Sequence, residues 1–160
     1  MSAPAIIRHA TEADAGALAR LRYEFRAELI APQEERAAFI RRAADWMTHA
    51  LRDGQWLCWI AEDDTGIIGS LWLYRIPKIP NPNGNPEEHA YVSSFCVCAN
   101  ARNRGIGSML LADALAFCEV RRIDSVILWP TERSRPLYLR HGFRVSTGML
   151  DKPIAGHHST

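Results

Sequence analysis

A junction between a strand and a helix, at residues 97–108, constrains the fold of this chain more than any other stretch. The segment reads VCANARNRGIGS; it follows an apolar run at 89–97 and leads into a helical pattern at 104–121. Gly105 and Gly107 lack a Cβ, so a ligand can approach the backbone closely there. The first amides of a helix have no carbonyl partner within it, and the helix dipole is positive at that end. The junction therefore predicts a binding site for phosphate oxygens.

The sequence of the junction argues against two common kinds of phosphate-binding site. No Gly-Lys-Ser/Thr sequence occurs, which excludes a P-loop, and Leu110 stands where a dinucleotide fingerprint needs its third glycine. Arg102 and Arg104 would add charge-assisted contacts to an anion. On the glycines alone, a tight turn without a ligand is an equal alternative; the flanking strand, helix and arginines favour the phosphate site.

Length and charge limit the classes of protein to consider. A chain of 160 residues suits one domain with a full-sized core, and 48% hydrophobic with 23% charged residues is ordinary for a globular protein. The net charge of +1 gives no reason to expect nucleic acid or an anionic membrane as a partner. No apolar run approaches the roughly 20 residues that span a bilayer, and the beginning of the chain lacks a signal-peptide pattern. We therefore expect a cytoplasmic protein.

The four cysteines are not spaced like metal ligands. Cys96 and Cys98 are the closest pair, but a zinc site needs a second pair at ligand spacing, and Cys58 and Cys118 are isolated from each other. We therefore expect free, buried thiols and no bound metal.

The hydrophobic periodicity predicts alternating strands and helices without a repeat or a domain boundary. Thr11 and Asp14 form a capping-box pattern before the first helix, and Gly54 ends the second. The loop at 77–88 is rich in proline and asparagine, and because it leads into the strand at 89–97 we expect it to border the active cleft and select substrate. Strands are expected at about 5–8, 56–62, 67–76, 89–97, 125–129, 143–146 and 149–152, and helices at about 12–29, 33–51, 104–121 and 134–141.

Two motifs, in this order, resemble the GCN5-related N-acetyltransferase (GNAT) family. Arg102-x-x-Gly105-x-Gly107 is similar to the family's pyrophosphate loop, and LYLRHGF, which starts at Leu137, is similar to its L-Y-x-x-x-G-F segment. The resemblance covers about 6–152 in element order. It implies an α/β fold with a mixed, mostly antiparallel sheet of about seven strands and helices on both faces. The fourth and fifth strands would run parallel and splay apart at one end. From length and sequence pattern we expect one domain over 1–160, with a disordered tail at about 155–160.

The same resemblance implies that acetyl-CoA is the acyl donor. Its amide-bearing arm would lie along the central strand and pair with the backbone as an added strand does. The pyrophosphate would bind mainly to backbone amides of the following loop. The residues implied in cofactor binding are Phe95, Cys96, Val97, Arg102, Asn103, Arg104, Gly105, Ile106, Gly107 and Ser108.

Acetyl transfer to an amine also needs groups that stabilise the developing negative charge and that donate or accept protons. The resemblance implies that a backbone amide near Val97 stabilises the oxyanion and that Tyr138 protonates the leaving thiolate, a task that suits a phenol protonated at neutral pH. The general base is open. Glu24, Glu88 and Glu132 are candidates, and ordered water with serine hydroxyls, or bulk solvent, is an equal alternative.

Some features of the family are changed in this chain. Many members carry an asparagine after the fifth strand; this chain has the sequence PTE there, which makes Thr131 the candidate for that contact. Some members carry a glutamate on the fourth strand, where this chain has two serines. Element position alone suggests the side chains that face the acceptor, which are Tyr23, Arg26, Trp72, Tyr74 and Ser93.

We therefore expect an N-acetyltransferase that moves the acetyl group of acetyl-CoA to a primary amine of a small molecule or peptide by direct transfer in a ternary complex. Members of the family often form dimers, so a homodimer is a further hypothesis. The main alternative is a non-catalytic acyl-CoA-binding or regulatory module of the same fold. A dinucleotide-binding domain is disfavoured by Leu110 and by the missing βαβ repeat.

Overall fold

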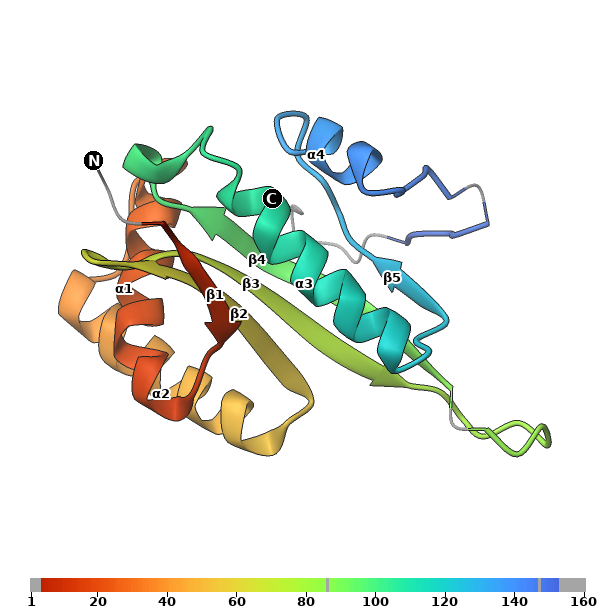
Figure 1. Ribbon diagram of the computed structural model, residues 1–160. Helices are drawn as coiled ribbons and strands as arrows, with labels where there is room; N and C mark the ends of the chain where they lie inside the picture. Colours follow the sequence, from red (N-terminus) through yellow and green to blue (C-terminus); the bar gives the residue numbers. More distant parts are fainter. Residues whose placement is uncertain (1–3, 86, 147, 153–160) are drawn as a thin grey trace. The chain divides into compact units, whose positions relative to one another are not determined.

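The computed structural model describes residues 4–85, 87–146 and 148–152 (Figure 1). The chain divides into two compact units, Met1–Trp129 and Pro130–Thr160. The first unit contains β1 (Ile6–His9), η1 (Glu12–Asp14), α1 (Ala15–Ala27), α2 (Arg36–Asp53), β2 (Trp56–Asp63), β3 (Gly66–Pro77), β4 (Glu88–Val97), η2 (Ala99–Ala101), α3 (Ile106–Val120) and β5 (Ser125–Ile127). The second unit contains α4 (Arg135–Arg140).

The strands of the first unit form one sheet in the order β1-β2-β3-β4-β5. The first three pairings are antiparallel, and β4 and β5 run parallel, as expected. Pairing between β4 and β5 ends at Tyr91 and Ile127, whereas β4 continues to Val97. The second half of β4 therefore has no β5 neighbour, which is the divergence that the resemblance implied.

Helices cover both faces of this sheet, as predicted (Figure 1). Side chains of α1 and α2 pack on the face that carries Cys58 and Ile60. On the opposite face, the ring of Trp59 contacts Phe117 of α3 with centroids 5.5 Å apart. Adjacent residues of β2 thus point to opposite helix layers, which explains why its sequence is apolar without alternation.

Local signals set most helix ends. The Asp14 carboxylate accepts the backbone N–H of Thr11 at 2.7 Å, which confirms the capping box, although the turn that it caps is the short η1. The carboxylate of Glu35 accepts the amides of Ala37 and Ala38, so α2 begins at Arg36 and not at residue 33. Gly54 ends α2 in the left-handed conformation, as predicted.

The sheet has five strands in the described part of the chain, not the expected seven. Residues 143–146 and 149–152, expected as a closing hairpin, have no regular secondary structure; Thr147, in its expected turn, lies outside the described residues. Val145 and Leu150 are 73% and 96% exposed. Their alternating pattern thus buries little apolar surface, and an isolated two-stranded hairpin is only marginally stable in water. The tail expected at about 155–160 also lies outside the described residues.

The proline-rich loop lies at the wrong end of β4 for the role expected of it. Pro77 pairs with Glu88 where the loop begins, and Gly69 pairs with Val97 at the other end of the same two strands. The loop is held locally, because the side-chain amides of Asn81 and Asn83 donate to the Glu87 carboxylate. About ten residues of strand, or roughly 30 Å, separate it from the phosphate-loop sequence, so it does not border that loop.

Candidate active site

A β-bulge interrupts β4 where it runs beyond β5. Ser70 pairs with Cys96 but Trp72 pairs with Ser93, so β4 has one residue more than β3 across this interval. Ser94, inside the bulge, has a φ of 50°, a left-handed conformation that is uncommon for residues other than glycine. Bulges redirect the strand that carries them, and this one sets the course of residues 95–97.

The backbone of Val97 faces the open edge of the sheet. The amide of the next residue, Cys98, donates to the Ile68 carbonyl of β3 at 2.8 Å. Because neighbouring amides of an extended strand point in opposite directions, the Val97 amide points away from β3. The Val97 carbonyl, on the same side, accepts Nε of Arg102 at 3.0 Å. An N–H group is therefore directed to the side on which β4 lacks β5.

The side chain of Arg102 connects the loop to β4 and to the end of α1. Besides its bond to Val97, its guanidinium donates to the Glu28 carboxylate at 2.7 Å, at the end of α1. Only 20% of the Arg102 side chain is exposed. These bonds engage Nε and Nη2 of Arg102 within the protein.

The turn at 102–108, at the start of α3, leaves its backbone accessible, and we call these residues the cradle. Asn103 and Gly105 have φ values of 61° and 77°, and the Gly105 carbonyl accepts the amide of Met109 to close the first helical turn. The amides of Ile106 and Gly107 lie within that turn, where an α-helix offers them no carbonyl. A Cβ on Gly105 would meet no atom within 4 Å, so the space above this backbone is open.

The side chains of the other residues expected to bind the cofactor differ in how exposed they are. Arg104 is exposed and lies 3.9 Å from the Asp63 carboxylate. Ile106 is buried, so only its backbone is available to a ligand, and Ser108 is half-buried in the first turn. Cys96 is buried as well, and burial raises the pKa of its thiol to about 11; its side chain packs on Ser70, 3.7 Å away.

Gly69 on β3 was not singled out from the sequence, yet it positions the cradle. A Cβ there would lie 3.2 Å from the Cys96 carbonyl, 3.3 Å from Leu110 and 3.4 Å from Val97. The absence of a side chain thus lets α3 pack closely against the end of β4. A glycine inside an apolar strand was the available signal, since it often marks a close backbone approach.

Tyr138 belongs to the second unit and is buried at the middle of α4. Burial raises the pKa of its hydroxyl to about 12, because the charged phenolate is disfavoured away from water. Its ring contacts Phe143 with centroids 5.5 Å apart. Before the helix, Thr131 and Ser134 hydrogen-bond to each other, with their hydroxyl oxygens 2.9 Å apart.

The candidate general bases are held in ion pairs. Glu24 accepts two bonds from Arg36, with both side chains exposed. Glu88 accepts two bonds from Arg75, and this contact lowers the pKa of its carboxyl. Glu132 is 93% exposed. The lowered pKa of the Glu88 carboxyl does not suit a base near neutral pH.

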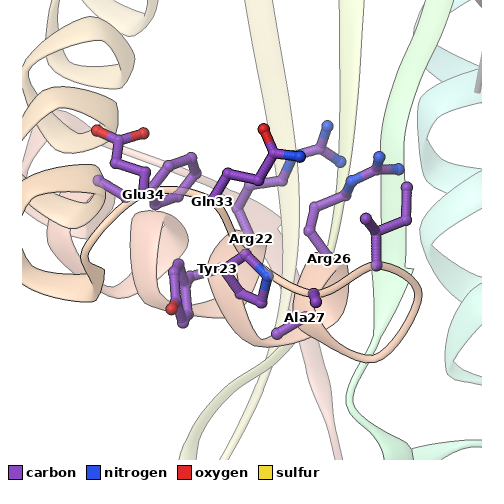
Figure 2. Close-up of a pocket in the computed structure, with 10 residues that line it drawn as sticks. Arg22, Tyr23, Arg26, Ala27, Gln33 and Glu34 are labelled. Atoms are coloured by element: carbon purple, nitrogen blue, oxygen red, sulfur yellow. The ribbon is translucent and has the colours of Figure 1, made fainter.

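A pocket of about 340 Å³ lies between the end of α1 and the start of α2 (Figure 2). Tyr23 and Arg26, two of the side chains expected to face an acceptor, line it. Trp72 and Tyr74 do not: Trp72 packs in the core against Trp46, and the Tyr74 hydroxyl donates to Gln55. The lining residues are Arg22, Tyr23, Arg26, Ala27, Ile30, Ala31, Pro32, Gln33, Glu34 and Phe39. Arg22, Ile30 and Gln33 were missed by sequence reasoning because only the fold brings the two helix ends together.

Neither the cysteines nor any other side chains suggest a metal centre in the described residues. All four cysteines are free; Cys58, Cys96 and Cys118 are buried, as expected, whereas Cys98 is only partly buried. No group of three or more His, Cys, Asp or Glu side chains in the described ranges is arranged to hold a metal ion. Among the same residues, no helix is long and apolar enough to cross a membrane.

Comparison with known families identifies the family to which this chain is similar. The sequence model of the Acetyltransferase (GNAT) family matches residues 18–143, which is most of the chain. The chain belongs to this family. A search of curated proteins finds no match at the significance required.

Solved structures of acetyltransferases share the fold. A predicted acetyltransferase from Clostridium acetobutylicum, solved with acetyl-CoA, is 21% identical with a TM-score of 0.78, over 98% of this chain and 100% of that one. A GCN5-related N-acetyltransferase from Ralstonia eutropha JMP134 is 26% identical with a TM-score of 0.72, over 96% and 100%. A ribosomal-protein-alanine N-acetyltransferase from Brucella melitensis biovar Abortus 2308 is 18% identical with a TM-score of 0.69, over 94% and 99%. This GNAT protein thus matches them along nearly its whole length.

Proposed function

We propose that this GNAT protein is an acetyl-CoA-dependent N-acetyltransferase that acetylates a primary amine of a small molecule or peptide. One observation carries the proposal: β4 continues beyond its pairing with β5, over 92–97, and leads directly into an exposed glycine cradle at the start of α3. The similarity to the Clostridium acetobutylicum protein that was solved with acetyl-CoA supports the choice of acyl donor. The family match spans both units, which supports one acetyltransferase domain.

The residues present fit coenzyme A. Its amide-bearing arm would pair with the edge of Phe95, Cys96 and Val97, where β4 lacks β5. Its pyrophosphate would meet the backbone of residues 102–108, where the amides of a first helical turn and the dipole of α3 favour negative charge. Bound there, acetyl-CoA supplies an activated acyl group as a thioester.

Direct transfer needs one oxyanion donor and one proton donor from this chain. The neutral amine attacks the thioester carbonyl, and the electron pair of the C=O bond moves to oxygen, where the Val97 amide donates a hydrogen bond. Collapse breaks the C–S bond, and the sulfur takes the proton of the Tyr138 hydroxyl. The amine nitrogen releases its extra proton to solvent, and the phenol is reprotonated from water. A phenol with a pKa of about 12 stays protonated until the thiolate forms.

Replacing the Tyr138 hydroxyl separates an enzyme from a non-catalytic acyl-CoA-binding module. Tyr138→Phe is expected to lower kcat by roughly 10²-fold or more, because proton transfer to sulfur is lost, while the Kd for coenzyme A stays the same. Turnover is measured by thiol release with acetyl-CoA over a panel of amines, and Kd by calorimetry. Leu139→Ala, a change at an exposed position of the same helix, is the matched control. Tight coenzyme A binding without turnover of any amine would instead support the regulatory module.

A further inference from the structure

Two arginines of α1, Arg22 and Arg26, face the pocket of Figure 2. Arg22 and Arg26 are four residues apart, so they share one helix face, and Figure 2 shows their guanidinium groups extending in the same direction. Both are partly buried. Among the described residues, no hydrogen bond or ion pair to either guanidinium is formed. Most other arginines of this layer are paired; Arg36, for example, binds Glu24.

The arrangement is electrostatically unfavourable in the absence of a ligand. Burial lowers the pKa of the Arg22 guanidinium, and the positive charge of Arg26 lowers it further. The only acidic side chain that lines the pocket, Glu34, is bound to Arg42 by two hydrogen bonds. Two partly desolvated like charges that no described carboxylate compensates favour an anion brought from outside.

The arginine pair also lies close to the proposed path of the cofactor arm. The Arg22 guanidinium lies near Cys96 of β4, because its charge favours the thiolate form of that thiol. The end of α1 is tied to the cradle through the bond of Glu28 to Arg102. The pocket therefore opens beside the strand on which the thioester would lie, on the face covered by α1 and α2.

We propose that the acceptor carries an oxyanion group, a carboxylate or a phosphate, that binds between Arg22 and Arg26 while its amine is left free to react. The assignment rests on the proposed acetyl transfer and names the substrate class of that site. Guanidinium groups match the planar geometry of a carboxylate and can bind it with paired hydrogen bonds. The side-chain amide of Gln33, on the same pocket, supplies a further donor.

The proposal is tested first on the unmodified protein, with acceptors that differ only in the anion. Each amino acid is compared with the amine left by its decarboxylation, as lysine with cadaverine, histidine with histamine and tyrosine with tyramine; phosphoethanolamine is compared with ethanolamine. We expect kcat/KM to be about 10- to 100-fold higher for the anionic member of at least one pair, mainly through KM, because charge-assisted hydrogen bonds are lost in the other. A carboxylate preference or a phosphate preference identifies the oxyanion.

Arginine variants then locate the binding site. Arg22→Gln and Arg26→Gln are expected to remove the preference for the anionic acceptor without changing the Kd for coenzyme A. Arg20→Gln is the control, since this arginine lies on the same helix but is exposed and does not line the pocket. Arg22→Lys keeps the charge and should retain part of the preference. Weaker coenzyme A binding in the glutamine variants would overturn the proposal, because the pair would then serve the cofactor.

The failure of this proposal and that of the acetyl transfer are distinguishable. Equal kcat/KM within every pair, with clear turnover, overturns the anionic acceptor and leaves the transferase intact. If no amine is acetylated, calorimetry with the same pairs still reports on the pocket. Binding of an anionic member that Arg22→Gln abolishes supports the anion site alone, and equal binding of both members overturns it.

Discussion

Replacing Arg102 by glutamine tests whether this arginine braces the phosphate loop or binds the ligand. Its guanidinium joins three segments: its own loop, the Val97 carbonyl at 3.0 Å and the Glu28 carboxylate at 2.7 Å. A hydrogen bond from a charged donor contributes about 1.5–3 kcal/mol, and an ion pair with a partner as exposed as Glu28 contributes about 0–1 kcal/mol. We therefore expect Arg102→Gln to lower the free energy of unfolding by about 2 kcal/mol. In a chain of this size that corresponds to a Tm lower by about 4–8 °C.

The control separates the two contacts of Arg102. Glu28→Gln keeps the bond to Val97 and loses only the charge of the partly exposed carboxylate, so its Tm is expected to fall by about 1–3 °C at most. Thermal unfolding and calorimetric titration with coenzyme A are measured for both variants at two salt concentrations. The reasoning is refuted if both variants unfold at the same temperature. It is also refuted if Arg102→Gln leaves the Tm unchanged and weakens coenzyme A binding in a salt-dependent way, as loss of a direct phosphate contact does.

Three further predictions follow from the packing and the pKa shifts. Gly69→Ala is expected to cost about 1–2 kcal/mol and to weaken coenzyme A binding, because the new Cβ presses on Leu110; chemical unfolding and titration measure both, and an unchanged Kd would contradict the positioning role. The contact with Arg8 lowers the pKa of Asp14 to about 2, so its stabilisation is present above pH 4 and is lost as the pH falls from about 4 to 2. Asp14→Asn should therefore lose about 1–2 kcal/mol at pH 7, and its difference from the unmodified protein in urea unfolding should vanish near pH 2. Because burial raises the pKa of Tyr138 to about 12, the rate should not fall from loss of that proton below about pH 11; a fall near pH 10 that is absent in Tyr138→Phe would contradict this.

Short-range patterns were the reliable part of the sequence. The capping box at Asp14 and the left-handed Gly54 occur as predicted, because each depends on neighbouring residues. The parallel pairing of β4 with β5 is long-range, and it was expected only from the family resemblance. The closing hairpin was wrong because alternation alone does not provide a face to pack against. The loop at 77–88 was misplaced because it joins the first residue of β4, whereas the cradle follows the last residue of that strand.

By itself the sequence predicted the tight turn before α3, since Gly105 and the start of the helix form it from consecutive residues and their backbone conformations. It could not determine that Arg102 bonds to Glu28, or that Arg22 and Arg26 find no ionic partner among the residues that the structure describes. Those facts depend on how α1 packs against the sheet. The sequence gives the charge of each side chain. Whether that charge is neutralised depends on which distant groups the fold places within a few ångströms of it.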